Sequence, residues 1–336
     1  MIEIRILVID VAAQHGGSVT ILEQFIEEFR RDKKNQYYVA LSTLSYQSSD
    51  NVSFLNYDWV KKSHLHRLFF DTFYIKKLVK EVRADRILSL QNKTVSVNGI
   101  PQDVYFHNAL PLSDKRFSLL ESKDLWVYQN VIGMIVKCSL KRACRIMVQA
   151  DWIKKQLVSK WHINEEIIEI KRPVVLSDFA SEENDRETAN NLNALFYPAS
   201  SALYKNHENL LLACVSLWNK NPKRFRLILT GHKNMLSDRC KSILEKGDYP
   251  VEFVGQLNHA EMQQYYQTTV LAFPSYIETV GLPLIEAKRN HGLILAADCE
   301  YAHESLGAYP NVRYFDPFDV NSIISVIDST IIPSNN

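Results

Sequence analysis

The stretch that decides the fold is FPSYIETVGLPLIEA, residues 273–287. The apolar residues that precede and open it predict a buried strand, and Pro283 suits the first turn of a helix. The loop between them carries Glu278 and Gly281, and Glu286 stands about one turn into the helix. A strand that runs into a helix in this way is a unit of a parallel α/β sheet. Ligands bind such sheets at the carboxyl ends of the strands, so the loops that follow strands are the candidate sites.

The same alternation of short strands and helices continues on both sides of this stretch. In the first half of the chain we expect strands at 4–9, 37–41, 86–90, 103–106, 145–149 and 167–170, and helices at 19–30, 73–82, 125–142 and 153–160. In the second half we expect strands at 194–197, 225–230, 251–254, 270–273 and 293–296, and helices at 207–218, 236–246, 261–268, 283–289 and 320–332.

A polar segment separates the two sets of elements. Pro173 interrupts the pattern, and residues 177–191 are polar and acidic, as is typical of a linker. The sequence therefore predicts an α/β protein with two Rossmann-like, doubly wound domains, 1–172 and 173–336, that face a central cleft. The last helix, 320–332, is a candidate to pack back on the N-terminal domain.

Composition narrows the class of protein. Of 336 residues, 39 are Lys or Arg, 38 are Asp or Glu, and 46% are hydrophobic, which excludes low-complexity disorder and a uniformly basic nucleic-acid binder. The five cysteines are odd in number and include no Cys-x-x-Cys pair, so they indicate neither a disulfide framework nor a zinc cluster. No run of about 18 apolar residues is present. We therefore expect a cytoplasmic protein.

Three further loops contain residues suited to ligand binding. Gly16 and Gly17 let backbone amides approach an anion at a helix N-terminus, and a tight turn is the alternative explanation. His107 ends an inner strand and can hydrogen-bond a sugar hydroxyl or a reacting group, unless it is a structural histidine. Lys205 precedes a helix N-terminus, where a cation can grip phosphate, although loop lysines are usually only solvated.

The two glutamates of the deciding stretch carry little information by spacing alone. Glu278 and Glu286 enclose seven residues, an interval that is common in soluble chains, and acids near a helix start are stabilised there in any case. Their context is more specific, because the loop glutamate, Gly281 with its exposed amides and the helix glutamate are expected to face one pocket.

In that context the stretch resembles the Glu-x7-Glu signature of the retaining nucleotide-sugar glycosyltransferases of family 4, which implies the GT-B fold. The resemblance extends over most of the chain and is carried by Pro274-Ser275, Glu278, Gly281-Leu282-Pro283, Glu286-Ala287, Gly16-Gly17, Val148–Lys154, Ile170–Val174, Lys205-Asn206 and Val251–Gly255.

The resemblance also implies roles for individual residues. Glu278 would contact the donor sugar beside the reacting carbon, Glu286 would accept hydrogen bonds from the ribose hydroxyls, and Lys205 would neutralise the diphosphate. Gly16 and Gly17 would face the diphosphate from the other domain, His107 would face the sugar, and Gly255 would lie near the base. Five further positions are implied in substrate binding: Ser200, Thr279, Val280, Gly281 and Leu282. Family members often carry an arginine where Ser200 and Ser201 stand, so one diphosphate cation is missing or comes from elsewhere.

A metal-independent mechanism follows from the same resemblance. The sequence contains no Asp-x-Asp triplet of the kind that holds a divalent metal in many transferases, so Lys205 and helix N-termini are expected to stabilise the departing diphosphate. We expect no cofactor and no metal. Transfer would proceed with retention at the anomeric carbon, with the departing phosphate oxygen taking the acceptor proton and Glu278 stabilising the developing oxocarbenium. Uridine diphosphate is favoured as the carrier on family frequency alone.

The balanced net charge hides two halves of opposite sign. Residues 1–172 contain 26 Lys and Arg against 19 Asp and Glu, and the remainder contains 13 against 19. Basic clusters fall within 30–34, 61–67, 76–80 and 137–142. They suit peripheral docking at an anionic membrane, the inner face of the cell membrane, although solvated helix faces explain them too. Because the family's N-terminal domain holds the acceptor, we expect a lipid-linked or oligosaccharide acceptor in the synthesis of bacterial O-antigen, lipopolysaccharide or capsule-type polysaccharide.

Two other classes of function stay open. A nucleotide-sugar epimerase or hydrolase of the same fold would act on the donor without an acceptor. A non-catalytic sugar-nucleotide-binding protein would be expected to lose Glu278, Lys205 or Glu286, all of which are present. A dehydrogenase is disfavoured because no Gly-x-Gly-x-x-Gly fingerprint follows the first strand of either half.

Overall fold

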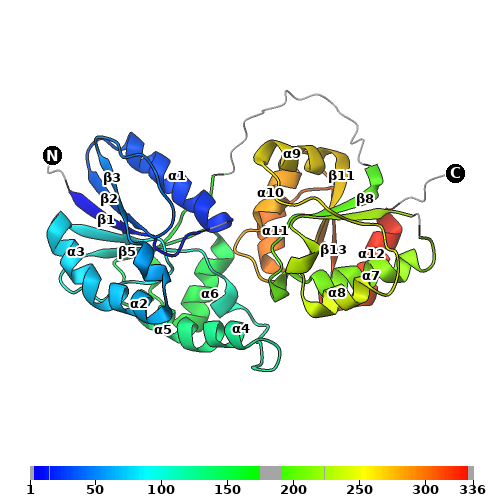
Figure 1. Cartoon of the computed structure of the whole chain (residues 1–336), viewed down its shortest axis with the longest axis horizontal. Helices are drawn as coiled ribbons and strands as arrows, with labels where there is room; N and C mark the ends of the chain where they lie inside the picture. The colour runs from blue at the N-terminus through cyan, green and yellow to red at the C-terminus, as the bar shows by residue number, and fades with distance from the viewer. Residues whose placement is uncertain (1–3, 15, 175–190, 223, 332–336) are drawn as a thin grey trace. The chain divides into compact units, whose positions relative to one another are not determined.

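The structure is a computed structural model that describes residues 4–14, 16–174, 191–222 and 224–331. The chain divides into two compact units, Met1–Val174 and Val175–Asn336, which are described separately (Figure 1). The division lies two residues after the boundary predicted from the sequence. Apart from Asn191, the expected polar linker 177–191 lies outside the described residues.

The first unit is built on a seven-stranded sheet in which every neighbouring pair is parallel. Its spatial order is β3-β2-β1-β4-β5-β6-β7, so the direction of winding reverses between β1 and β4. The strands are β1 (Arg5–Ile9), β2 (Gln36–Leu41), β3 (Val52–Asn56), β4 (Arg86–Ser89), β5 (Gln102–Phe106), β6 (Arg145–Val148) and β7 (Ile168–Ile170).

Helices cover both faces of this sheet (Figure 1). Side chains of β1 alternate between two hydrophobic clusters: Val8 packs with Phe25 of α1 on one face, and Ile9 packs with Leu78 of α3 on the other. This double cover explains why the strand is a continuous apolar run. The helices are α1 (Gly17–Arg31), α2 (His64–Phe69), α3 (Ile75–Val82), α4 (Lys123–Val127), α5 (Gly133–Leu140) and α6 (Asp151–Trp161), with π-helical turns at Phe70–Tyr74 and Tyr128–Ile132.

The second unit repeats this architecture with six parallel strands in the order β10-β9-β8-β11-β12-β13. Its winding reverses between β8 and β11. The strands are β8 (Asn191–Tyr197), β9 (Arg226–Leu229), β10 (Val251–Phe253), β11 (Thr269–Phe273), β12 (Ile294–Ala297) and β13 (Val312–Phe315). The helices are α7 (His207–Trp218), α8 (Asp238–Leu244), α9 (His259–Thr268), α10 (Leu282–Arg289), α11 (Glu300–Leu306) and α12 (Val320–Thr330).

The α/β class with two parallel, Rossmann-like sheets is confirmed. Two strands, β3 and β13, were not expected from the sequence, and both lie at a sheet edge, where one side of the strand has no neighbour. Both contain exposed or half-exposed positions, so their hydrophobic pattern is weak. The terminal helix α12 packs on α7 and β13 of its own unit, burying Ile323 and Ile327.

Two kinds of feature are absent from the described ranges. None of the helices there is long and apolar enough to cross a membrane. The same ranges contain no group of three or more His, Cys, Asp or Glu side chains that could hold a metal ion.

A buried acid ties three strands of the first sheet together at the amino ends. Asp103 at the start of β5 is almost fully buried and accepts hydrogen bonds from Arg86 on β4 and Arg145 on β6, each at 2.8 Å. Arg145 also contacts the exposed Glu169 on β7 at 3.2 Å. Breaking a buried pair leaves a charge uncompensated, whereas an exposed pair contributes little.

We predict that Asp103→Asn lowers the free energy of unfolding of the first unit by about 3 kcal/mol, because two arginines lose their buried counter-charge. The matched change Glu169→Gln should cost about 0.5 kcal/mol or less. Urea unfolding followed by tryptophan fluorescence reports mainly this unit, which holds four of the five tryptophans, Trp59, Trp126, Trp152 and Trp161. Equal effects of the two substitutions would contradict the assignment.

Candidate functional site

The candidate site lies where the winding of the second sheet reverses. Strands β8 and β11 are neighbours there, and their following loops, 198–206 and 274–281, diverge toward helices on opposite faces of the sheet. Loops that part in this way leave room for a ligand at the carboxyl ends of the strands. The structure brings Lys205 from the first loop and Glu278 from the second loop together at this point.

Lys205 and Glu278 form an ion pair between Nζ and Oε1. Their side chains are only 17% and 15% exposed, so each charge is largely withdrawn from water. The Nζ atom also lies 5.6 Å from the centre of the Tyr204 ring. A partly buried pair costs desolvation energy that only close contact recovers. The pair therefore places one cation and one carboxylate, both ordered, at the edge of the sheet.

Backbone contacts hold the two loops against each other. The amide of Tyr276 and the hydroxyl of Ser275 both donate to the carbonyl of Tyr204, at 3.1 and 3.3 Å. Tyr301 donates its hydroxyl to the carbonyl of Ser275 at 2.5 Å, and Tyr197 donates to the carbonyl of Lys205 at 2.6 Å. The loop backbones on both sides of the ion pair are thus anchored by buried tyrosines from β8 and α11.

Asn206 links the same loops to a third segment. It is buried at the start of α7 with φ +61°, a left-handed conformation that asparagine tolerates better than most residues. Its Nδ2 donates to the carbonyls of Pro274 at 3.2 Å and Pro317 at 2.7 Å. One side chain therefore joins the loops after β8, β11 and β13 directly beside Lys205.

Glu286 lies on α10 with its carboxylate turned to a neighbouring helix. Its Oε2 accepts a hydrogen bond from the buried hydroxyl of Tyr266 on α9 at 2.7 Å. Burial raises the pKa of the Glu286 carboxyl, while this hydrogen bond and the charges of His259 and Arg289 oppose the rise. The carboxylate is thus held in one orientation, as an acceptor for hydroxyl groups must be.

Gly281 starts α10 with φ +62°, and a Cβ there would lie 3.1 Å from the Tyr301 ring. Only glycine fits this turn without displacing its neighbours. No side chain caps the N-terminus of α10, and the first turn of the helix holds no acid. The hydroxyl of Ser305 donates to the carbonyl of Val280 at 2.5 Å. Thr279 and Leu282 flank this turn and are partly exposed.

Two other positions expected in the second domain lie in the loops that follow β10 and β8. Gly255 follows β10 with φ +72° and pairs with Gly231 through two backbone hydrogen bonds, at 2.7 and 3.2 Å. Ser200 is exposed in the loop after β8, where the amide of its neighbour Ala199 donates to the hydroxyl oxygen of Thr230 at 3.1 Å.

The candidate residues of the first domain occupy the carboxyl edge of their own sheet. His107 follows β5, and its Nε2 is 2.9 Å from the carbonyl of Leu90, which assigns the ring proton to Nε2. Burial lowers the pKa of His107, so the ring is neutral at pH 7. Gly16 begins α1 with φ +62° and ψ −145°, and a Cβ at Gly16 or Gly17 would meet no atom within 4 Å. The glycine loop is therefore open on its outer side.

The fold and this site define a GT-B protein, two parallel α/β units of which the second carries a polar site at its winding reversal. Residues 178–332 match the family "Glycosyl transferases group 1", so the second unit carries a glycosyltransferase domain. No curated protein matches the chain. Sucrose-phosphate synthase from Thermosynechococcus elongatus is a similar solved structure, with 16% identity and a TM-score of 0.70 over 97% of this chain and 89% of that chain. HepE of Anabaena in complex with UDP and glucose has 15% identity and a TM-score of 0.65 over 97% of this chain and 89% of that chain. WaaG, a glycosyltransferase involved in lipopolysaccharide biosynthesis, has 14% identity and a TM-score of 0.65 over 97% of this chain and 90% of that chain.

Sequence reasoning missed the residues that hold the site in place. Asn206, Tyr266 and Tyr301 act through contacts with residues 20 to 111 positions away. Only Asn206 had a local signal, because asparagine directly before a helix is a common cap. The tyrosines lie within predicted helices or outside the expected elements, and nothing in the spacing marks them.

We predict that Asn206→Asp destabilises the second unit by about 3 kcal/mol, because a carboxylate would then face two carbonyl oxygens without a donor. Asn206→Gly should cost about 1–2 kcal/mol, since glycine keeps the left-handed backbone and loses only the two hydrogen bonds. Trp218 is the single tryptophan of this unit, so its fluorescence during urea unfolding, in chains whose other tryptophans are replaced by Phe, measures both changes. A loss of stability in Asn206→Asp that is no greater than in Asn206→Gly would contradict the assigned role of the Nδ2 donor.

Proposed function

We propose that the protein is a retaining, metal-independent glycosyltransferase of family 4 that moves a sugar from a nucleotide diphosphate to a lipid-linked or oligosaccharide acceptor. The observation that carries this proposal is the ordered Lys205–Glu278 pair at the winding reversal of the second sheet, within the matched glycosyltransferase domain. The two charges suit the two ends of a breaking glycosyl–phosphate bond.

The chemistry assigns opposite tasks to the two side chains. As the bond breaks, negative charge gathers on the diphosphate oxygen and positive charge on the anomeric carbon. Lys205 stabilises the departing diphosphate, and the uncapped N-terminus of α10 adds a partial positive charge. Glu278 stabilises the oxocarbenium on the same face, the phosphate oxygen takes the proton of the acceptor hydroxyl, and the configuration is retained.

Donor recognition is proposed from the surrounding residues. Glu286, oriented by Tyr266, accepts hydrogen bonds from the ribose hydroxyls, and the turn at Gly281 offers amides to the donor. Gly255 stands near the base, while Gly16, Gly17 and His107 of the first domain are assigned to the diphosphate and the sugar. Uridine diphosphate is the favoured carrier, supported by UDP in the structures of HepE and of S. aureus TarM.

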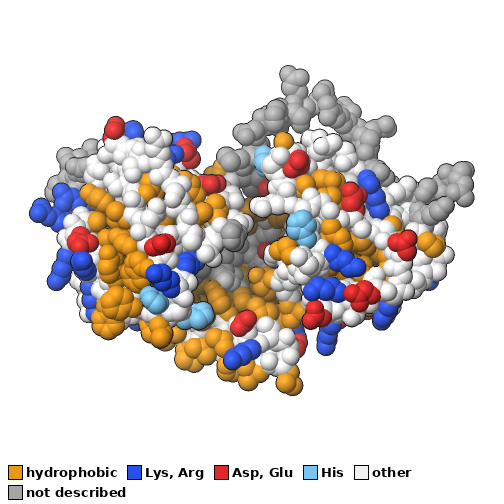
Figure 2. Space-filling view, viewed as in Figure 1, with side chains coloured by type: hydrophobic (Ala, Val, Ile, Leu, Met, Phe, Trp, Pro, Cys, Tyr) orange, Lys and Arg blue, Asp and Glu red, His pale blue; other side chains and the backbone are white. Residues whose placement is uncertain are grey.

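The acceptor is proposed to be presented at an anionic membrane, as suits lipopolysaccharide or O-antigen synthesis. The support is an exposed apolar surface on α2 and the following π-helical turn, the α2 surface, made of Leu65, Leu68, Phe69 and Phe73, which are 51–76% exposed. Lys62, Lys76 and Lys77 border it. Figure 2 shows hydrophobic and basic side chains together on the side of the first unit where Figure 1 places α2 and α3. Exposed apolar groups bordered by lysines suit the interface of an anionic bilayer.

We predict that Glu278→Gln lowers the transfer rate by at least about 100-fold, because a neutral amide cannot stabilise the oxocarbenium, while UDP binding persists. Lys205→Gln should weaken UDP binding as well as transfer. The exposed Glu245→Gln provides the matched control with unchanged rates. The measurement is nucleoside diphosphate release from a panel of nucleotide sugars, with NMR of the anomeric proton of the product. Wild-type turnover in Glu278→Gln, or an inverted product, would overturn the mechanism.

The same assay separates the alternatives. Diphosphate release with free sugar as the product, whether or not an acceptor is present, would identify a hydrolase. A changed donor sugar would identify an epimerase, and UDP binding without turnover of any donor would identify a non-catalytic binding protein.

We predict that the double variant Leu65→Ser, Phe73→Ser binds phosphatidylglycerol vesicles about tenfold more weakly, since apolar area that enters the bilayer interface is removed. Met235→Ser, an equally exposed apolar site in the second unit, is the control and should bind as the unchanged protein does. Sedimentation with the vesicles at low and high salt measures both. Absence of binding to anionic vesicles at low salt would rule out peripheral attachment.

A further inference from the structure

A second charged cluster lies at the winding reversal of the first sheet, and the proposed function leaves it without a ligand. Strands β1 and β4 are neighbours there, and the amide of Leu90 donates to the carbonyl of Ile9 at 3.0 Å. The loops that follow the two strands diverge beyond this hydrogen bond. Asp10 follows β1 and Gln91 lies just beyond β4. This is the position in the first unit that corresponds to that of Lys205 and Glu278 in the second.

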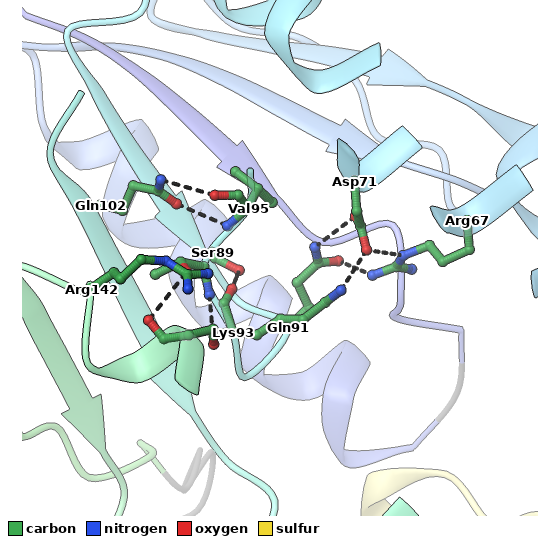
Figure 3. A network of polar contacts seen from close by, with 10 residues as sticks. Arg67, Asp71, Ser89, Gln91, Lys93, Val95, Gln102 and Arg142 are labelled. Carbon is green, nitrogen blue, oxygen red and sulfur yellow. Dashed lines mark hydrogen bonds and ion pairs between the residues drawn. The ribbon is translucent and has the colours of Figure 1, made fainter. Parts of the chain in front are cut away.

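Two cations share one buried carboxylate in this cluster (Figure 3). Asp71, which is buried in the π-helical turn after α2, accepts from Nε of Arg67 at 3.0 Å and from Nζ of Lys93 at 2.7 Å. Gln91 bridges the group, since it donates to Asp71 at 3.5 Å and accepts from Arg67. The carboxylate balances only one of the two positive charges.

Lys61 adds a third cation without an acidic partner of its own. Its Nζ donates to the carbonyl of Ala12, in the loop that leads from β1 to α1, at 3.1 Å. It forms no ion pair with any described residue. Burial and the charge of Arg67 lower the pKa of Lys61, while the charge of Asp10 acts against that decrease.

The carboxyl of Asp10 does not fully neutralise the remaining positive charge near pH 7. Burial raises the pKa of Asp10 to about 7, while the hydrogen bond from the amide of Ala13 and the charges of Arg67 and Lys61 act against that rise. The carboxyl is therefore only partly ionised near pH 7. Three cations against one full carboxylate leave an excess of positive charge that is partly withdrawn from water. Such an excess is costly unless an anion binds.

We propose that Lys61, Arg67 and Lys93 bind a phosphoryl group of the acceptor, an inference that rests on the proposed glycosyltransferase function. Lysine and arginine side chains are the usual donors to the oxyanion of a phosphate, and Arg67 and Lys93 already meet at one carboxylate. The donor diphosphate already has a cation in Lys205, on the other unit. The acceptor class that follows is a sugar or lipid that carries a phosphoryl group.

The test is calorimetric titration of the full-length protein with inorganic phosphate at pH 8, in the presence of saturating UDP. Lys61→Gln should weaken phosphate binding about tenfold, because a charge-assisted hydrogen bond is lost. Asp10→Asn should strengthen binding severalfold, because it removes the negative charge that faces the same cations. Lys155→Gln, an exposed lysine on α6 of the same unit, is the matched control and should leave binding unchanged.

The opposite signs expected for Lys61→Gln and Asp10→Asn separate a binding role from a structural one. Weaker binding in both variants, or equal binding in all, would overturn the proposal, as would an unchanged protein that does not bind phosphate. Thermal unfolding of each variant verifies that the fold persists, and Asp10→Asn decides the question if Lys61→Gln does not fold.

Two further arms identify the source of the phosphate. UDP binding should be unaffected by Lys61→Gln and weakened in Lys205→Gln; weakening in both would assign the cluster to the donor and overturn the proposal. Binding to phosphatidylglycerol vesicles should also be unaffected by Lys61→Gln, whereas a loss would assign the cluster to bulk lipid headgroups. A failure of UDP to bind at all contradicts the proposed function, while the phosphate titration of Lys61→Gln still tests the cluster.

Discussion

The contact between Lys205 and Glu278 is the interaction on which the candidate site depends. Two largely buried charges are stable only if each lies against the other, so the loops that carry them must keep a fixed separation. Asn206, Tyr197 and Tyr301 fix it by hydrogen bonds to backbone carbonyls rather than to the charged groups themselves. The ionic groups thus remain available to a ligand, while the scaffold around them is satisfied internally.

The winding reversal of a parallel sheet explains why polar groups gather in both units. Elsewhere along the carboxyl edge each loop is covered by the next helix, but neighbouring loops part at the reversal and polar ends stay accessible. The second unit places an ion pair there, and the first places Arg67 and Lys93 around Asp71, with Lys61 and Asp10 at the loop that follows β1. The same topology therefore supports two differently charged sites.

The sequence predicts the inner strands and most helices, because strands covered on both faces are continuous apolar runs such as β1 and β11. It misses β3 and β13 at the edges, where one strand side is unpaired and the pattern fades. Lys205 and Glu278 were selected by resemblance, yet their contact across 73 positions could not be derived from spacing. Tyr266, Tyr301 and the Arg67–Asp71–Lys93 cluster were missed because only the tertiary fold brings their partners together.

The division into two separately packed cores has a consequence for how such enzymes diversify. The hydrophobic clusters of the unit that carries Lys61, Arg67 and Lys93 consist entirely of residues before position 174. The loops around Glu278 are anchored by residues after 190. Mutations that reshape one recognition surface therefore need not disturb the packing beneath the other. Under the proposed function, selection can exchange the residues that bind the acceptor while those that bind the donor are inherited unchanged.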